Sequence, residues 1–537
     1  MLKQRVITAL VLLAILLPAL FYPSPVPFAA VALVFMGAGA WEWGRLNGLA
    51  GAASVGLGAV CVAMCGAAWA AVWNSGEGRH EYRRDVDVAF RGDRIVHVGP
   101  DYRGAADEVV DGRARFVMPG LVNVHAHSGS EPAGKGLREE HGVPEMYMTG
   151  LYERLAAFRI DGDGQLAASE YGYCELLLSG VTTVVDLNAA TPGWLDLAAR
   201  SGLRVYLGPA YASARWVVAN RHALGYDWDE TAGRRGFDQA LSLIDAARRH
   251  PCGRLGGVVA PGQIDTCSES LLRDSLAAAV ERGLTFTTHA SQSVVEFHEM
   301  VRRHGATPLQ WAGSIGLLGP HTLLAHAIFI DTHSWLRWHT RRDLDLLADS
   351  GTRVAHCPLP FARYGAMLED LGGYLRRGVR IGLGTDTLPL NMLEEMRTAL
   401  MVSHIAARDV HAVGTGDVFH AATVGGADAL RRDDLGRLAT GAKADLVLVD
   451  LDHPGMHPLR DPLRSLVYVA ADRAVRDVYV DGRKVVADRK VLTLDQEAAS
   501  ARLDEAQGRA ARDIPRRDWA GRTVDQFAPR SLSMSNP

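Results

Sequence analysis

From residue 80 onward, short runs of apolar and β-branched residues alternate with stretches whose apolar positions recur at helical spacing. Such alternation is typical of βα units, in which helices cover a parallel sheet. Amphipathic patterns predict helices at 237–249, 269–282 and 343–350. Eight runs predict strands, at 116–125, 181–188, 204–209, 255–260, 284–289, 322–328, 353–356 and 380–384. Eight units predict an α/β fold of the (β/α)8 TIM-barrel type, whose functional groups lie at the C-terminal ends of the strands.

The segments on either side of the predicted barrel show the alternation of antiparallel strands. Residues 85–98 alternate and turn like a hairpin, and residues 445–451 and 475–486 do the same around Asp481-Gly482. We therefore expect a small β-domain formed by 76–115 and 440–490, which flanks a barrel domain of residues 116–435. The charged segment 491–537 has few strand-forming residues and predicts a C-terminal helix followed by a tail.

The first 75 residues contain two long stretches without charge, 6–41 and 46–76. Because a helix needs about 20 apolar residues to cross the hydrocarbon core, we expect one or more membrane helices here. Lys3, Arg5 and Arg45 would mark the cytoplasmic side, so that the chain is membrane-associated with its catalytic domain in the cytoplasm. A cleaved signal peptide is the alternative, but it leaves the later apolar runs unexplained.

Two N-terminal segments, MLKQRVITALVLLAILLPALF and AWEWGRLNGL, resemble the N-terminus of bacterial phosphatidate cytidylyltransferases. The resemblance ends near residue 70, and the catalytic signature that this family carries in its C-terminal half has no counterpart here. It therefore implies membrane attachment without transferase chemistry. A membrane protein of the cytidylyltransferase type with an incidental barrel stays an alternative.

Composition narrows the class of protein. A chain of 537 residues exceeds what one hydrophobic core usually serves, and 48% hydrophobic with 22% charged residues suits a globular protein. The net charge of -4 offers no basic surface, so nucleic acid is excluded as a partner. The six cysteines form no CxxC pair and indicate no disulfide framework. Whether the chain forms a homo-oligomer is open.

Histidines and an aspartate fall at the ends of predicted strands. His125 and His127 end the first strand, two positions apart, so both imidazoles can face one cation. His289 ends the fifth strand, His326 lies in the sixth, and Asp386 follows the eighth. A lone H-x-H is weak evidence. The joint placement of all five side chains on one rim of the barrel favours a metal site over separate structural roles.

The sequences around these residues resemble the amidohydrolase superfamily over about residues 80–490. The matching segments are FVMPGLVNVHAH, TTHAS, LLAHAIFID, IGLGTDT and LGRLATGAKADLVLVDLD. The resemblance implies a metal-dependent hydrolase of small molecules, with one divalent ion and an assisting histidine at position 326. It assigns the metal ligands to His125, His127, His289 and Asp386.

The number of metal ions follows from a missing residue. Binuclear members of the superfamily bridge two metals with a carbamylated lysine at the fourth strand, but no lysine lies between Lys135 and Lys443. We therefore expect one ion. Three imidazoles and a carboxylate favour Zn²⁺, while Fe²⁺, Co²⁺ and Mn²⁺ stay open. Such an ion lowers the pKa of bound water from 15.7 to about 7, so the expected reaction is attack of metal-bound hydroxide on an electrophilic carbon.

The catalytic residues that we predict are Asp386, His326 and Gln292. Asp386 would pass the water proton to the leaving group, and His326 would orient the water or stabilise charge. Related deaminases carry a glutamate where this chain has Gln292, and a neutral amide cannot shuttle a proton. The predicted pocket residues in other strand-end loops are Lys135, Tyr147, His222 and Phe361, together with Trp216 and Tyr364.

The predicted function is hydrolysis of a carbon–nitrogen bond, other than a peptide bond, in a small molecule. The local sequence is similar to the mononuclear branch that acts on triazines, phenylureas and thiocarbamates. An aminohydrolase (deaminase) of a heterocycle that uses another proton shuttle is the alternative. A catalytically inactive barrel that serves as a binding module is a third hypothesis, which the metal content of the purified protein decides.

Overall fold

The computed structural model describes residues 80–137, 150–220 and 223–534, together with scattered positions between 31 and 59. The chain divides into two units, Met1–Glu81 and Tyr82–Pro537, and everything below concerns the second. Apart from the scattered positions, the predicted membrane segment 1–75 lies outside the described residues. Within the described part of the chain, no helix has the length and apolar character needed to cross a membrane.

Eight parallel strands form a closed barrel, as the sequence predicts. They pair as two four-stranded sheets, in the orders β4-β5-β6-β9 and β10-β11-β12-β13. Parallel bridges between Val259 and Phe286 and between Ala126 and Asp386 join the sheets on both sides. The strands are β4 (Leu121–Ala126), β5 (Val181–Asn188), β6 (Arg204–Pro209), β9 (Leu255–Gly257), β10 (Phe286–Ala290), β11 (Thr322–His326), β12 (Arg353–His356) and β13 (Arg380–Leu383).

The first predicted strand, 116–125, is wrong as a single element. Its beginning is β3 (Arg115–Pro119), which pairs antiparallel with β14 (Leu446–Asp450) outside the barrel, and only β4 enters the barrel. The chain crosses between the sheets at Gly120, where an added Cβ would lie 2.1 Å from the Thr182 hydroxyl. Both strands are apolar, so the hydropathy pattern does not change at Gly120 and does not indicate that one strand ends there.

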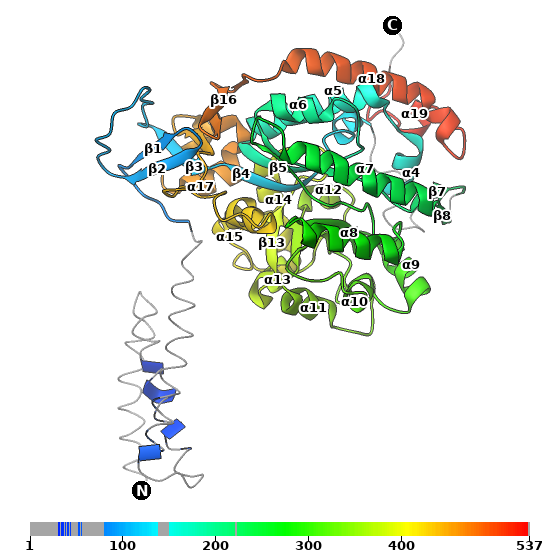
Figure 1. The fold of residues 1–537 in the computed structure, drawn as a ribbon, viewed down its shortest axis with the longest axis horizontal. Helices are drawn as coiled ribbons and strands as arrows, with labels where there is room; N and C mark the ends of the chain where they lie inside the picture. Colours follow the sequence, from blue (N-terminus) through cyan, green and yellow to red (C-terminus); the bar gives the residue numbers. More distant parts are fainter. Residues whose placement is uncertain are drawn as a thin grey trace. The chain divides into compact units, whose positions relative to one another are not determined.

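The barrel strands are buried on both faces. Inside the barrel, side chains such as Val124, Leu187 and Leu323 form one apolar cluster, and a larger cluster fills the space between strands and helices. Burial on two sides explains why the strands read as continuous apolar runs. The longer covering helices are α5 (Gly162–Leu178), α7 (Glu230–Arg248), α8 (Glu269–Glu281), α9 (Val294–His304) and α14 (Met392–Ala407) (Figure 1). Shorter helices include α4 (Gly150–Ala157), α6 (Trp194–Ser201), α10 (Pro308–Ser314), α11 (Asp343–Ser350), α12 (Pro358–Arg363), α13 (Leu371–Arg377) and α15 (Thr415–His420).

The flanking sheet combines β3, which comes before the barrel and was predicted as part of its first strand, with four strands that follow the barrel. Its five strands run in the order β17-β16-β15-β14-β3, and Asp481-Gly482 turns the β15–β16 hairpin. A separate hairpin, β1–β2, joins it through a bridge between Arg94 and Lys443. The remaining strands are β1 (Asp87–Arg91), β2 (Arg94–Gly99), β15 (Val475–Val480), β16 (Arg483–Ala487) and β17 (Lys490–Val491).

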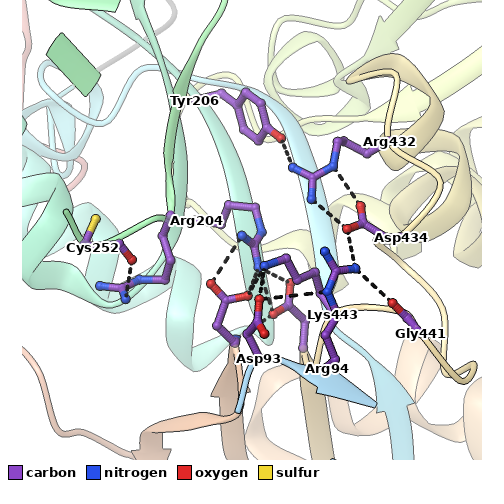
Figure 2. Close-up of polar contacts among 12 residues, drawn as sticks. Asp93, Arg94, Arg204, Tyr206, Cys252, Arg432, Asp434, Gly441 and Lys443 are labelled. Atoms are coloured by element: carbon purple, nitrogen blue, oxygen red, sulfur yellow. Dashed lines mark hydrogen bonds and ion pairs between the residues drawn. The ribbon is translucent and has the colours of Figure 1, made fainter. Parts of the chain in front are cut away.

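A buried ion-pair network fastens the barrel to this flanking sheet (Figure 2). Arg204, the first residue of β6, donates to Asp481 at 2.5 Å and to Asp445 at 3.2 Å. Lys443 pairs with Asp93 at 2.6 Å and with Asp481 at 3.2 Å. Arg204 and Asp445 are almost fully buried, so each charge depends on the other for compensation.

The C-terminal segment forms the predicted helix, α18 (Gln496–Arg517), followed by a short α19 (Val524–Phe527). α18 lies along α5 on the outside of the barrel (Figure 1). The side-chain amide of Gln507 donates to the carbonyls of Ala133 and Lys135 at 2.7 Å each. The C-terminal helix therefore supports the loop that follows the first barrel strand.

Candidate metal centre

Four side chains meet at the C-terminal rim of the barrel: His125, His127, His289 and Asp386. One nitrogen or oxygen from each lies within 4.8 Å of the others. The Nε2 atoms of His125 and His127 each lie 3.3 Å from Oδ1 of Asp386, and the Nε2 atoms of His127 and His289 lie 3.3 Å apart. The structure thus brings together all four residues that the sequence predicts as ligands.

Barrel closure delivers Asp386 to the histidines. The Asp386 amide donates to the His125 carbonyl at 2.8 Å, and the His127 amide donates to the Asp386 carbonyl at 3.0 Å. Gly384 allows this approach, because an added Cβ would lie 2.7 Å from Cβ of His125 and 2.8 Å from its carbonyl oxygen. The glycine two residues before Asp386 is therefore a requirement of the site.

Backbone carbonyls fix the orientation of two imidazoles. Nδ1 of His127 lies 2.8 Å from the Leu187 carbonyl, and Nδ1 of His289 lies 2.6 Å from the Gly262 carbonyl. A carbonyl only accepts, so Nδ1 carries the proton in each ring and Nε2 of the neutral ring presents a lone pair. The two lone pairs face each other beside a carboxylate, an arrangement that calls for a cation between them.

Burial and the neighbouring charges set the electrostatics of the cluster. Burial lowers the pKa of His289 well below its ordinary value, and the adjacent histidines add to this. Burial also lowers the pKa of His125, although Asp386 opposes the shift. For Asp386, burial alone would raise the pKa, but the surrounding imidazoles hold it well below its usual range. A carboxylate ionised in a closed pocket of imidazoles is the donor set that a divalent metal prefers.

Three of the six donor pairs have the spacing of ligands around one tetrahedral ion, and the whole set lies within 4.8 Å. Ligand atoms about 2.0–2.1 Å from a tetrahedral zinc lie about 3.3–3.4 Å from one another, and the three contacts above measure 3.3 Å. Both ring nitrogens of His125 are buried without a hydrogen-bond partner among the described residues. A bound metal would supply the partner that one of these nitrogens lacks.

His326 lies against the cluster at the end of β11. Its ring centroid is 5.1 Å from that of His125 and 5.3 Å from that of His289, and its backbone φ is 82°. Burial lowers the pKa of His326 to about 3, so the ring is neutral at physiological pH. Neither ring nitrogen has a partner among the described residues. A neutral, unpaired imidazole in this position can hydrogen-bond a water or a substrate group.

Gln292 follows His289 by three residues and is buried. Its backbone amide donates to Glu296 at 2.9 Å, and the amide of Ser291 donates to the other oxygen of Glu296 at 2.6 Å. Both oxygens of Glu296 are thus engaged in holding the loop. Burial raises the pKa of Glu296 well above its usual range, although the two amides oppose this shift.

The other predicted pocket residues lie in different surroundings. Phe361 packs against His326, with ring centroids 4.8 Å apart. Lys135 instead pairs with Glu175 and lies over the ring of Tyr171, 4.4 Å from its centroid. The carboxylate of Glu175 therefore compensates its charge. Tyr147 and His222 lie outside the described residues. Sequence reasoning missed Tyr152, which adjoins the cavity that Gly262 and Gln263 line and belongs to a helix without a metal-site motif.

Comparison with known proteins identifies a family and a fold. The model of the amidohydrolase family matches residues 116–485. The 5-methylthioadenosine/S-adenosylhomocysteine deaminase of Haloarcula marismortui is 31% identical over 427 residues, covering 79% of this chain and 93% of that protein. The 5'-deoxyadenosine deaminase of Methanothermobacter thermautotrophicus is 30% identical over 434 residues, covering 78% and 95%.

Two solved structures share the fold. An adenosine deaminase from Xanthomonas campestris with bound zinc superposes with a TM-score of 0.70 at 24% identity, covering 81% of this chain and 95% of that one. The atrazine chlorohydrolase of Arthrobacter aurescens TC1, complexed with zinc, gives 0.67 at 22% identity, covering 79% and 95%. The matched family region begins at residue 116, so the resemblance of the N-terminal segment to cytidylyltransferases stays a prediction.

Proposed function

The chain belongs to the amidohydrolase family, and from that premise we propose that His125, His127, His289 and Asp386 hold a single divalent ion, Zn²⁺ in the first instance. The chain is accordingly a hydrolase of carbon–nitrogen bonds in small molecules. The observation that carries the ligand assignment is the convergence of three imidazole nitrogens and one carboxylate within 4.8 Å. When bound, such an ion supplies a Lewis acid and a hydrolytic water of lowered pKa.

The protein side chains have separable roles in this proposal. Asp386, ionised and within 3.3 Å of two histidines, accepts the proton of the attacking water and returns it to the leaving nitrogen. His326, neutral and unpaired among the described residues, orients the water or the substrate carbonyl. Phe361 holds the His326 ring from the side. Gln292 offers an amide that positions substrate without moving a proton.

We favour a substrate whose leaving group needs little acid assistance, such as an amide, urea or carbamate. The support is Gln292 in place of a proton-shuttling glutamate, with both oxygens of Glu296 engaged by backbone amides. Deamination of an adenosine-type ring is the second candidate, because curated relatives at 30–31% identity carry that activity in their names.

Metal analysis and substrate screening test the proposal together. We expect about one equivalent of zinc in the full chain purified with added Zn²⁺, with hydrolysis lost on chelation and restored by the ion. His125→Ala should remove both metal and activity, whereas His298→Ala, an exposed histidine on α9, should change neither. Metal content below about half an equivalent, or activity that survives chelation, would overturn the proposal.

The leaving group separates the two candidates. A panel of amides, ureas and carbamates is assayed for released amine, and adenosine and 5'-deoxyadenosine are assayed for ammonia. Under the favoured candidate, Gln292→Glu brings no gain in rate. If ring deamination is the activity, ammonia is released from the purine, and Gln292→Glu raises the rate by about 10²–10⁴-fold, the usual contribution of a general acid.

A further inference from the structure

A cavity of about 360 Å³ lies between α4, the segment 210–216 and the loop 262–266. Gly262 and Gln263 line it, and both are joined to His289, the first through the Nδ1 contact of 2.6 Å and the second through a parallel bridge. The volume lies in the range of small-molecule sites. One wall of the cavity is therefore formed by residues that contact His289 through its backbone and its Nδ1 atom.

Two aromatic rings form another wall of this cavity. Tyr152 of α4 and Trp216 of β7 (Ala214–Val218) meet edge to face, with ring centroids 4.7 Å apart and planes at 83°. The Tyr152 hydroxyl lies 2.6 Å from Oγ of Ser293, the residue that follows Gln292. Tyr152 is thereby anchored to the loop that carries Gln292, and Trp216 stays partly accessible from the cavity.

A buried carboxylate fixes the indole of Trp216. Oδ2 of Asp265 accepts from Nε1 of Trp216 at 3.0 Å and from the hydroxyl of Tyr226 at 2.7 Å. Trp216 and Tyr226 are direct partners across the β7–β8 hairpin, where β8 is Leu224–Trp228. Arg303 stacks on Tyr226 at 4.2 Å and donates to the Asp265 carbonyl at 2.6 Å. One fully buried residue thus sets the position of both rings of the hairpin.

We propose that Trp216, with the buried Tyr152 packed behind it, forms the binding wall for a planar, π-bonded ring of the substrate, and that Asp265 is the positioning residue that holds Trp216 in place. Because Gly262 and Gln263 connect this cavity to His289, we assign the cavity to the non-reacting part of the substrate. An aromatic face binds a planar, π-bonded ring more tightly than the buried apolar area alone accounts for. A saturated ring of equal size gains only the binding free energy of that buried area. The inference deepens the proposed function by naming the substrate class, and its catalytic part rests on that function.

Binding of matched ligands tests the wall independently of hydrolysis. The probes are phenylurea and cyclohexylurea, titrated against the zinc-loaded full chain by calorimetry. We expect phenylurea to bind about 10-fold tighter than cyclohexylurea. Trp216→Ala should abolish that preference, and Trp216→Phe, which keeps a ring, should retain most of it. Equal affinities of the two ureas, or an unchanged preference in Trp216→Ala, would overturn the proposal.

Kinetics and a double variant test the role of Asp265. With any substrate that the chain hydrolyses, Trp216→Ala and Asp265→Asn should each raise KM about 10-fold and leave kcat within about 3-fold, with zinc content unchanged. Trp216→Phe lacks the indole N–H that Asp265 accepts, so adding Asp265→Asn to this variant should raise KM little further. A full additional effect there would show that Asp265 acts elsewhere and would remove its positioning role.

The two proposals fail in different ways. If the chain binds zinc and planar rings but hydrolyses nothing in the panel, the proposed function fails and the binding wall stands. If the chain hydrolyses a substrate while the Trp216 variants keep the wild-type KM and ring preference, the binding wall fails and the proposed function stands.

Discussion

Replacing Gly384 by alanine should disable the metal centre without removing any ligand. The new Cβ would lie 2.7 Å from Cβ, 2.8 Å from the carbonyl oxygen and 3.0 Å from the amide nitrogen of His125, whereas ordinary Cβ contacts begin at 3.4 Å. The backbone around Gly384 and His125 must therefore separate by about 0.4–0.7 Å, as the difference between these distances requires. Metal–ligand distances hold to about 0.2 Å. The separation exceeds this tolerance and shifts Asp386 away from His125 and His127.

We expect Gly384→Ala to hold less than half an equivalent of zinc under conditions where the wild type holds about one, and to lose about 100-fold in kcat/KM, as misplacement of about 1 Å does elsewhere. Zinc content is measured by mass spectrometry after dialysis. Gly382→Ala on the same strand is the control, because its Cβ meets side-chain atoms of Val124 at 3.0 and 3.1 Å rather than the backbone of a ligand. Stoichiometric zinc and activity within 3-fold in Gly384→Ala would refute the reasoning.

Two further predictions concern stability. Arg204→Met leaves Asp445 buried without its partner and should cost about 3–5 kcal/mol in urea unfolding; a loss below 1 kcal/mol would contradict it. Burial lowers the pKa of His356 to about 4, so the unfolded chain binds more protons between pH 6.5 and 4, and stability falls as the pH drops through that window. The shift is worth about 2 kcal/mol at pH 5, and His356→Asn should remove it; an identical stability difference between pH 7 and pH 5 in both proteins would disprove the assignment.

Much of the barrel was predictable because strands that are buried on both faces form continuous apolar runs in the sequence. The predicted strands 181–188, 204–209 and 353–356 coincide with β5, β6 and β12, and the predicted helix 343–350 coincides with α11. Each is an apolar or amphipathic run with turn residues at its ends. The cluster of His125, His127, His289 and Asp386 was predictable for a related reason. The C-terminal ends of parallel strands meet on one rim, and polar side chains there are conspicuous next to apolar strands.

What could not be predicted depends on contacts between distant segments. The β7–β8 hairpin alternates too weakly to be recognised, and its position comes from the buried Asp265, 49 residues after Trp216. Lys135 was expected in the pocket, but its charge is met by Glu175, 40 residues away on α5. The separation of β3 from β4 depends on pairing with β14. The sequence around Trp216, Lys135 or β3 gives no indication of the distant residues that each of them contacts.

The metal centre and the closure of the barrel depend on each other. The bridge between Ala126 and Asp386 closes the cylinder and also places the only carboxylate of the described ligand group beside the imidazoles. Without a cation, the ionised carboxylate of Asp386 is buried among imidazoles at this rim. Burial opposes protonation of these imidazoles, so they do not readily supply a balancing positive charge. An ion that binds only the closed barrel adds RT ln(1 + [L]/Kd) to its stability. Zinc should therefore raise the Tm of the wild type and leave that of His125→Ala unchanged, which links metal binding to the folded barrel even before a substrate is known.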